Sequence, residues 1–310
     1  MKIFDAHCDL LDKMNLHAEL SFKQDSIYAD VSFPRLNKAG VAVQCFAVFV
    51  SNRPHVSFTQ LLEAFDTFHN RIASHEGVRH IRSKADLTEA EASGKLGAIL
   101  TLEGADGLEG SLVNLRTAFA MGVRMLGLTW NYANWAADGV LEPRNGGFTL
   151  KGKKLIEECT KLGLILDVSH LSDKGFWELA ELSSAPFCAS HSNVRKLCPH
   201  PRNLTDEMIQ VLIARKAVMG LTFVPWFIKA SEPAIKDILT HLDHVAALGG
   251  REHVGFGSDF DGVDYHIPGL EHAGNYDRLA NEIYRRYSAE DAEGVLYGNW
   301  RRFMSENLPG

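Results

Sequence analysis

The chain has 310 residues, of which 45% are hydrophobic and 23% charged, and its formal net charge is −7. This length fits one α/β barrel, so we expect a single domain over residues 1–310 with a sizeable core. The negative charge disfavours the basic surface that nucleic acids and anionic membranes require, and neither partner is expected.

The cysteine pattern and the two ends of the sequence indicate in which cellular compartment the protein is expected. Five scattered cysteines, without a CxxC pair, are expected to be free thiols: Cys8, Cys45, Cys159, Cys188 and Cys198. A disulfide framework is therefore not expected, which fits a reducing compartment. The sequence shows no signal-peptide pattern, no apolar run of roughly 18 residues and no hydrophobic tail. We expect a soluble protein of the cytoplasm.

Short apolar runs alternate with amphipathic helical patterns along the whole chain. The expected strands cover residues 3–8, 41–50, 97–102, 124–130, 164–169, 187–190, 218–224 and 254–257. The expected helices lie near residues 57–76, 111–121, 151–162, 172–182, 205–215, 232–248 and 275–286. Apolar strands separated by helices indicate a parallel sheet covered by helices.

The residues that follow the strands decide between two kinds of parallel sheet. An open, doubly wound sheet would show the same alternation of strands and helices. Polar residues of similar chemistry follow many of the strands, however, which favours a (β/α)8 TIM-type barrel. The longest irregular stretch, residues 131–149, follows the fourth strand and is expected to form a lid or pocket wall.

Histidine and carboxylate side chains follow the first and third expected strands. His7 and Asp9 are two positions apart, so they would share one face of the strand end. That spacing suits a metal-ligand pair and a capping or surface role about equally. Glu103 ends the third strand. Alone it would be a solvated loop residue, but at this end of the barrel its two oxygens could bridge two cations.

The fifth and sixth strands both end in Ser-His, at His170 and His191. One such histidine would be interpreted as a core residue, whereas two at consecutive strand ends are typical of metal ligands. With His7, Asp9 and Glu103 they form a set that suits zinc, manganese or another borderline divalent ion. Five ligands exceed the needs of one tetrahedral zinc but suit two ions that share a carboxylate.

Three further residues lie where they could act on a substrate. Asp259 follows the eighth strand, where a barrel enzyme places a general base. Asp261, which precedes a glycine, could equally cap or close a turn. Arg202 lies in the loop before the helix near 205–215. It either pairs with a surface acid or clamps a substrate carboxylate.

The chain resembles the membrane (renal) dipeptidase family of binuclear zinc peptidases, in a soluble bacterial-type form. The most specific matches are GLILDVSH at 163–170, SHS at 190–192 and GSDFDG at 257–262. Further matching pieces are residues 5–10, 102–104, 122–129, 147–152, 186–193 and 201–207. The resemblance implies a distorted (β/α)8 barrel that hydrolyses dipeptides, including L-D dipeptides.

The resemblance also implies a role for each matching ligand. His7 and Asp9 would hold one Zn²⁺, His170 and His191 the other, and Glu103 would bridge the two ions. A hydroxide shared by the ions would attack the peptide carbonyl. Homodimer formation is expected on the same ground.

Two further roles and one departure follow from the resemblance. Asp259 would accept the proton of the hydroxide and pass one to the leaving amine, and Arg202 would bind the C-terminal carboxylate of the dipeptide. Family members carry a histidine after the fourth strand, in a Leu-Thr-His context, that steadies the oxyanion. Here Trp130 replaces it. Either a zinc ion alone polarises the carbonyl, or a neighbour such as Asn131 helps, or substrate specificity has moved.

Two other functions stay open at this point. One is a related binuclear metal amidohydrolase that acts on another amide, lactam or ester. The other is a barrel that binds metal or ligand without catalysis, against which Asp259 speaks because a binding protein needs no general base.

Overall fold

The structure is a computed structural model that describes residues 1–50 and 56–310. These residues form one nine-stranded sheet in which every strand pair is parallel. The strands are β1 (Ile3–Asp5), β2 (Val41–Phe49), β3 (Val78–His80), β4 (Leu96–Glu103), β5 (Val123–Gly127), β6 (Ile165–Asp167), β7 (Phe187–Cys188), β8 (Met219–Leu221) and β9 (Val254–Phe256).

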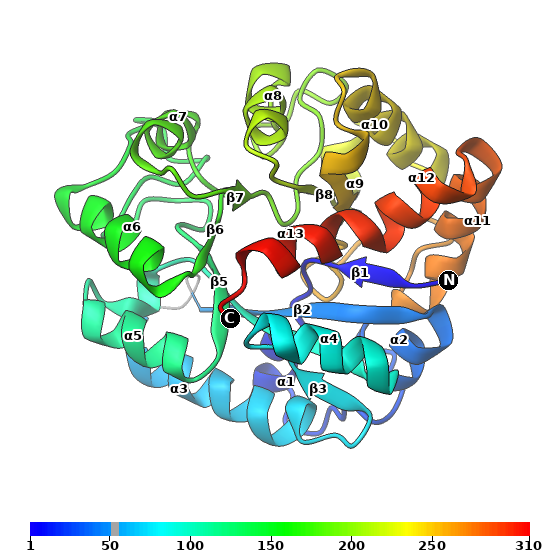
Figure 1. The fold of residues 1–310 in the computed structure, drawn as a ribbon, viewed down its shortest axis with the longest axis horizontal. Helices are drawn as coiled ribbons and strands as arrows, with labels where there is room; N and C mark the ends of the chain where they lie inside the picture. Colours follow the sequence, from blue (N-terminus) through cyan, green and yellow to red (C-terminus); the bar gives the residue numbers. More distant parts are fainter. Residues whose placement is uncertain (51–55) are drawn as a thin grey trace.

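The order of the strands and one bridge make the sheet a nearly closed barrel. Neighbours follow the order β7-β6-β5-β4-β2-β1-β9-β8, with β3 beside β4 and off this path. Just after β7, Ala189 forms a parallel bridge with Met219 of β8, and the Gly220 N–H donates to the Ala189 carbonyl at 2.7 Å. This contact joins the two ends of the path. The prediction of a barrel, rather than an open sheet, is confirmed (Figure 1).

Helices surround the strands (Figure 1). They are α1 (Leu10–Leu16), α2 (Phe33–Ala39), α3 (Phe58–Thr67), α4 (Lys84–Ser93), α5 (Leu112–Ala120), α6 (Leu150–Leu162), α7 (Asp173–Leu182), α8 (Asp206–Ala214), α9 (Pro225–Ile228), α10 (Ile235–Ala247), α11 (Tyr276–Arg286), α12 (Ala289–Glu293) and α13 (Asn299–Asn307). Short 3₁₀ and π segments are η1 (Phe68–Ala73), η2 (Asp106–Leu108), η3 (Arg251–His253), η4 (Ala273–Asn275) and η5 (Gly294–Gly298).

All seven predicted helices are present, and their first residues show why. The side chains of Ser111, Ser172 and Thr205 each accept a backbone N–H three residues later, at the starts of α5, α7 and α8. Such N-caps satisfy amide groups that the helix itself leaves without a partner. The eight predicted strands are also present, although several are shorter than expected.

The pattern of apolar residues did not predict β3, nor the helices α1, α2, α4, α9, α12 and α13. β3 is three residues long and pairs only with the first part of β4. α13 has a plain function in the fold, since Trp300 is fully buried and its ring stacks on Phe4 of β1 at 5.9 Å. This helix therefore closes the amino-terminal end of the barrel.

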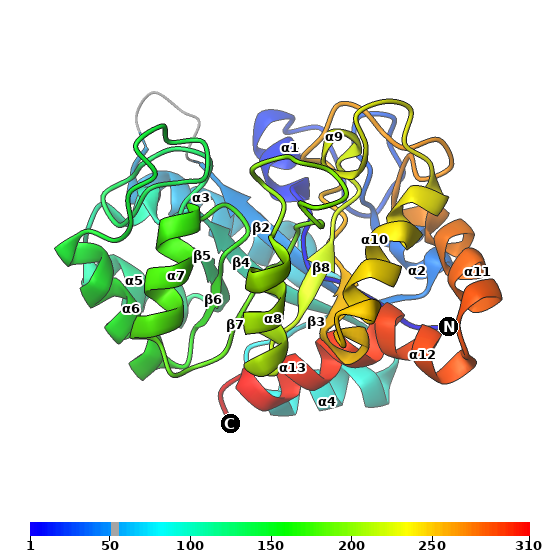
Figure 2. The ribbon, with the colours of Figure 1, turned by 90° about the horizontal axis from the view of Figure 1, so that it is seen from above.

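The two ends of the barrel are different. Figure 2 shows α13 and α4 together at one end, and α1 and α9, which follow β1 and β8, at the other. The carboxyl ends of parallel strands all open onto this second end, where barrel enzymes carry their chemistry. No helix within residues 1–50 and 56–310 is long and apolar enough to cross a membrane.

Candidate metal centre

The strand ends bring the predicted metal ligands together. Each of the five is at least 92% buried, and together they lie at the carboxyl ends of four strands: His7 and Asp9 after β1, Glu103 at the end of β4, His170 after β6 and His191 after β7. Three overlapping groups of donor atoms, each spanning less than 4.8 Å, connect these residues and Asp259. The sequence prediction therefore located one compact cluster.

Glu103 lies between the two pairs of donors. Its Oε1 is 2.7 Å from His170 Nε2 and 3.7 Å from His191 Nε2. Its other oxygen, Oε2, is 3.7 Å from His7 Nε2. Ligands of one zinc, bound at about 2.1 Å in a tetrahedron, lie about 3.4 Å apart. Oε1 could therefore bind the same ion as His170 and His191. Oε2 could bind a second ion together with His7.

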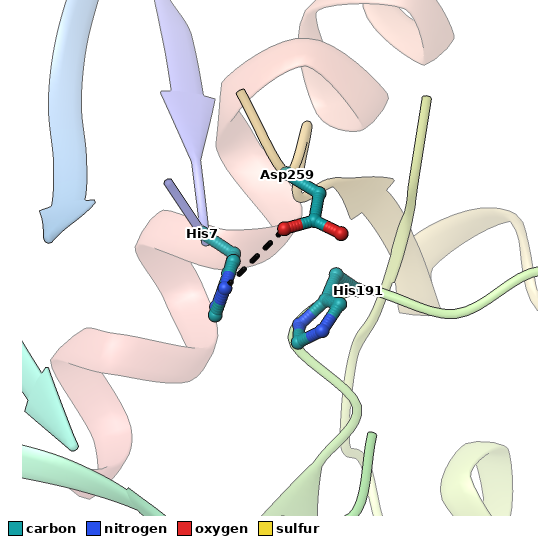
Figure 3. A group of neighbouring side chains, drawn as sticks. All are labelled: His7, His191 and Asp259. Carbon is teal, nitrogen blue, oxygen red and sulfur yellow. Dashed lines mark ion pairs between the residues drawn. The ribbon is translucent and has the colours of Figure 1, made fainter. Parts of the chain in front are cut away.

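His7 lies among three carboxylates. Its Nε2 is 3.5 Å from Asp9, 3.7 Å from Glu103 and 3.7 Å from Asp259, and Figure 3 shows its ring beside the carboxylate of Asp259 and the ring of His191. The His7 and His191 ring centroids are 3.8 Å apart. Within the described residues, His7 Nε2 and Asp9 Oδ1 are buried without a hydrogen-bond partner. Buried polar atoms left in this way need another partner, such as a cation.

Hydrogen bonds fix the imidazoles of His170 and His191 in the same tautomer. The Nδ1–H of His170 donates to the side-chain oxygen of Asn131 at 2.8 Å. Ser190 donates its hydroxyl to Asp167 at 2.5 Å, so its oxygen accepts from Nδ1 of His191 at 2.7 Å. Both rings therefore turn an unprotonated Nε2 toward the centre, where the two atoms are 3.0 Å apart. This is the tautomer of a metal ligand.

Two buried aspartates that sequence reasoning did not select hold the ligand loops in place. Asp167 accepts hydrogen bonds from both the backbone N–H and the hydroxyl of Ser169 and of Ser190, at 2.5–3.1 Å. Asp5 accepts from the His7 N–H and from both the N–H and hydroxyl of Ser258, at 2.7–3.3 Å. The signal was available, because each aspartate precedes a predicted ligand by two or three residues.

The pKa shifts differ between the two halves of this cluster. Burial lowers the pKa of His7, but the carboxylates of Asp9 and Glu103 outweigh it and raise that pKa to about 10. Burial, together with the positive charge of Arg202, lowers the pKa of His170 and of His191 far below the ordinary value. The rings of His170 and His191 are therefore neutral, and each has a nitrogen that can offer a lone pair to a cation beside a group of buried acids.

Asp259 has a strained backbone and a carboxylate directed at the centre. Its φ is +65° and that of Asp261 is +68°, in the left-handed region that few non-glycine residues adopt. A Cβ on Gly262 would lie 2.3 Å from both Asp259 Oδ1 and Asp9 Oδ2, so only glycine fits beside them. Burial, and then the Asp9 carboxylate, raise the pKa of Asp259 to about 7.

Asp261, for which the sequence allowed a capping or turn-closing role, binds the backbone of a distant loop. Its carboxylate accepts the backbone N–H groups of Asp30 and Val31, at 2.6 and 3.1 Å. In return the Asp30 carboxylate accepts the Asp261 N–H at 2.9 Å, and His266 Nε2 at 2.8 Å. This network ties the loop that follows α1 to the loop that carries Asp259.

Arg202 is buried beside the histidine pair rather than paired with a surface acid. Its Nη2 lies 3.2 Å from His170 Nε2 and donates to the His191 carbonyl at 3.2 Å. Its guanidinium lies 5.4 Å from the ring centroid of Phe227. Within the described residues, its Nε and Nη1 have no hydrogen-bond partner. These unpaired N–H groups lie on different edges of the guanidinium, and each could donate a hydrogen bond to an acceptor from outside the chain, such as a carboxylate oxygen.

Trp130 and Asn131 occupy the far side of His170. The Trp130 ring is 6.1 Å from the His170 ring and 5.2 Å from that of Phe49. The side-chain oxygen of Asn131 is hydrogen-bonded to His170 Nδ1, so this side chain orients a histidine instead of facing the carbonyl of a substrate. Val140 of the long loop donates its N–H to the His170 carbonyl at 2.8 Å. This loop therefore lies against the centre.

These residues fit a divalent metal, and comparison with known proteins agrees. A set of neutral imidazole nitrogens and carboxylate oxygens suits zinc and similar borderline ions, and the buried atoms without partners converge on it. The family model described as membrane dipeptidase (peptidase family M19) matches residues 1–308. The chain belongs to the membrane dipeptidase family. It is a metallo-dipeptidase, as the resemblance predicted.

Several relatives align over most of this chain. Dipeptidase aclJ of Aspergillus oryzae is 31% identical over 299 residues, which cover 91% of this chain and 71% of that protein. Human dipeptidase 3 is 29% identical over 319 residues, which cover 98% of this chain and 64% of that protein. These identities extend beyond the metal-ligand motifs.

Solved structures of the family share the fold. A structure described as the dipeptidase AC, a metallo peptidase of family M19, superposes with a TM-score of 0.91 at 25% identity, over 100% of this chain and 99% of that one. A metallo peptidase from Rhodobacter sphaeroides, liganded with a phosphinate mimic of the dipeptide L-Ala-D-Ala, gives 0.89 at 25% identity over 99% of both chains.

Proposed function

We propose that this metallo-dipeptidase hydrolyses dipeptides, including L-D dipeptides, at a centre of two zinc ions. His7 and Asp9 would hold one ion, His170 and His191 the other, and Glu103 would bridge them. The observation that carries the proposal is the carboxylate of Glu103, since its Oε1 faces His170 and His191 and its Oε2 faces His7. One tetrahedral ion with three protein ligands and an open position would leave two of these five ligands unused.

The proposed zinc ions supply one part of the chemistry. When bound, they would polarise the peptide carbonyl and make water a better nucleophile at neutral pH. The remaining steps belong to residues of the chain. The buried carboxylate of Asp259, 3.7 Å from His7, would accept a proton from the attacking water and deliver one to the leaving amine.

Arg202 supports the choice of a dipeptide as substrate. A guanidinium with two buried N–H groups free for a ligand would bind the carboxylate at the C-terminus of the substrate. Its distance of 3.2 Å from His170 would keep that carboxylate within one residue of the scissile bond. Only a peptide with a single residue after the bond would then fit both sites.

The mimic bound to the relative from Rhodobacter sphaeroides resembles L-Ala-D-Ala, which supports L-D dipeptides among the substrates. We propose the cytoplasm as the location, because all five cysteines are buried and form no disulfide. A homodimer remains an expectation from the family resemblance.

Metal analysis combined with a dipeptide panel tests the proposal. We expect two zinc ions per chain after zinc loading, and hydrolysis of L-L and L-D dipeptides. An Asp259→Asn variant serves as a matched control, because it should keep the metal and lose turnover. A protein that binds no divalent metal and cleaves no dipeptide after zinc addition would contradict the proposal. Cleavage of amides or lactams without a terminal carboxylate would instead favour a related amidohydrolase.

A further inference from the structure

Arg195, which lies four residues after His191, grips the loop that carries Arg202 on both sides of that residue. Its Nε donates to the carbonyl of Asn203 at 2.7 Å, and its Nη2 donates to the carbonyl of Pro201 at 2.9 Å. These are the residues directly before and after Arg202. One guanidinium therefore holds the backbone carbonyls of the residues on both sides of Arg202.

The other edge of this guanidinium is fixed to the start of α7. Nη1 and Nη2 of Arg195 donate to the two carboxylate oxygens of Asp173 at 2.6 and 2.7 Å. Asp173 is the first residue of α7 and lies three residues after His170. A bidentate pair of this kind fixes orientation as well as distance. Arg195 thus joins the loop of Arg202 to the segment that ends at His170.

Arg202 needs this external support, because its own side chain makes few polar contacts. Within the described residues only its Nη2 is hydrogen-bonded, while Nε and Nη1 remain free for a ligand. The position of its guanidinium therefore depends on the position of its backbone. The fork of Arg195 reaches an acid and two carbonyls at once, a geometry that a lysine ammonium on a flexible stem cannot reproduce.

We propose that Arg195 is a positioning residue for substrate recognition: together with Asp173 it sets the distance between the carboxylate clamp, Arg202, and the histidine pair. This inference rests on the proposed function, because it assumes that Arg202 binds the substrate carboxylate. Arg195 touches neither the substrate nor a metal ligand side chain. It acts only through Arg202.

A double-mutant cycle on the zinc-loaded enzyme tests the inference, with a dipeptide as substrate. Arg195→Ala should raise KM and lower kcat/KM by about 10-fold, as changes behind a binding residue commonly do, while kcat changes less. Arg195→Lys should behave almost like Arg195→Ala. In the Arg202→Ala background, Arg195→Ala should change kcat/KM by less than about twofold, because the residue through which it acts is gone.

Controls separate positioning from a general loss of structure. Lys196→Ala is the matched control, since its ammonium pairs with Asp206 and holds no carbonyl of the Arg202 loop. This variant should keep the wild-type KM. Thermal unfolding and metal content are measured for each variant. Asp173→Asn replaces Arg195→Ala in the cycle if the latter does not fold, and should raise KM in the same direction.

The outcomes distinguish this inference from the proposed function. If Arg202→Ala leaves kcat/KM for dipeptides unchanged, the proposed role of Arg202 is wrong and the inference is overturned with it. If Arg202→Ala is damaging but Arg195→Ala is not, the inference alone is overturned. Additive effects of the two substitutions would likewise overturn it, because independent sites add.

Discussion

Replacement of Asp167 by asparagine should reverse the direction of the hydrogen bonds that orient His191. Asp167 Oδ1 accepts three hydrogen bonds, from Ser169 N, Ser169 Oγ and Ser190 N, whereas Oδ2 accepts only the Ser190 hydroxyl. The amide oxygen of an asparagine must take the Oδ1 place, because three donors face it. The amide nitrogen must then take the place of Oδ2 and donate to Ser190.

This reversal changes the tautomer of His191, which is a proposed metal ligand. With its oxygen now accepting from the asparagine, Ser190 would donate its hydroxyl to Nδ1 of His191, 2.7 Å away. The imidazole proton would move to Nε2, which faces His170 and Glu103. A protonated Nε2 offers no lone pair to a cation. Asp167→Asn thus removes a ligand without touching the ligand residue.

The expected loss of stability in Asp167→Asn follows from the number of hydrogen bonds that residue 167 keeps. Three of the four hydrogen bonds accepted by residue 167 remain, so the fold should tolerate the change with a loss of about 1–2 kcal/mol. Metal affinity should fall about 10- to 100-fold, as is typical when the orienting partner of a ligating histidine is changed. Turnover at a limiting zinc concentration should fall with it.

Chelator competition measures the metal affinity, and ¹⁵N NMR of labelled histidine reports the tautomer. Asp5→Asn is the matched control, since Asp5 is equally buried and also accepts from a serine, Ser258. That serine can donate to the His7 carbonyl at 3.1 Å instead, and no imidazole nitrogen depends on it. Asp5→Asn should keep its metal. Wild-type zinc affinity in Asp167→Asn, with Nδ1 of His191 still protonated, would refute the reasoning.

Three further predictions follow from the same coordinates. Glu103→Gln should reduce the bound zinc from two ions to at most one, measured by elemental analysis, because an amide cannot supply two anionic oxygens. The hydrogen bond to Asp30 raises the pKa of His266 above 6.5, so their pairing stabilises the fold below that pH and fades as pH rises through the raised pKa. Urea unfolding should therefore show His266→Gln to be more destabilising at pH 6 than at pH 9, and equal losses at both would contradict the pairing. Gly257→Ala should cost about 3 kcal/mol or more in thermal unfolding, because its Cβ would lie 1.8 Å from the Ser190 carbonyl oxygen.

The sequence was sufficient to predict the barrel and the cluster at its carboxyl end. Runs such as residues 97–102 and 164–169 are mostly apolar and do not alternate with polar residues, which is typical of strands buried on both faces. Because parallel strands share one carboxyl end, residues 103, 170 and 191 had to meet. The helices that begin after Ser111, Ser172 and Thr205 were equally clear, because a cap and an amphipathic pattern occur together there. The sequence did not predict β3, because three residues of mixed polarity are too few to show a strand periodicity.

What the sequence could not reveal is which polar atoms satisfy one another across loops. Arg195 follows a strand end and looks like an ordinary surface cation, and its contacts with Pro201 and Asn203 arise only when two loops fold together. The commitment of Asn131 to His170 is likewise a matter of geometry, since an asparagine beside Trp130 could as well have faced the substrate.

The short strands explain why buried aspartates lie behind the proposed ligands. β6 and β7 have three and two residues, so their ladder alone holds the ends that carry His170 and His191 only weakly. Asp167 of β6 compensates, because it accepts the N–H and hydroxyl of Ser190 beyond the end of β7. Asp5 does the same from β1 toward Ser258 beyond β9. On each side of the centre a carboxyl acceptor thus continues the strand pairing by one more step, and these hydrogen bonds, in addition to the sheet, hold the proposed ligands at their distance from one another.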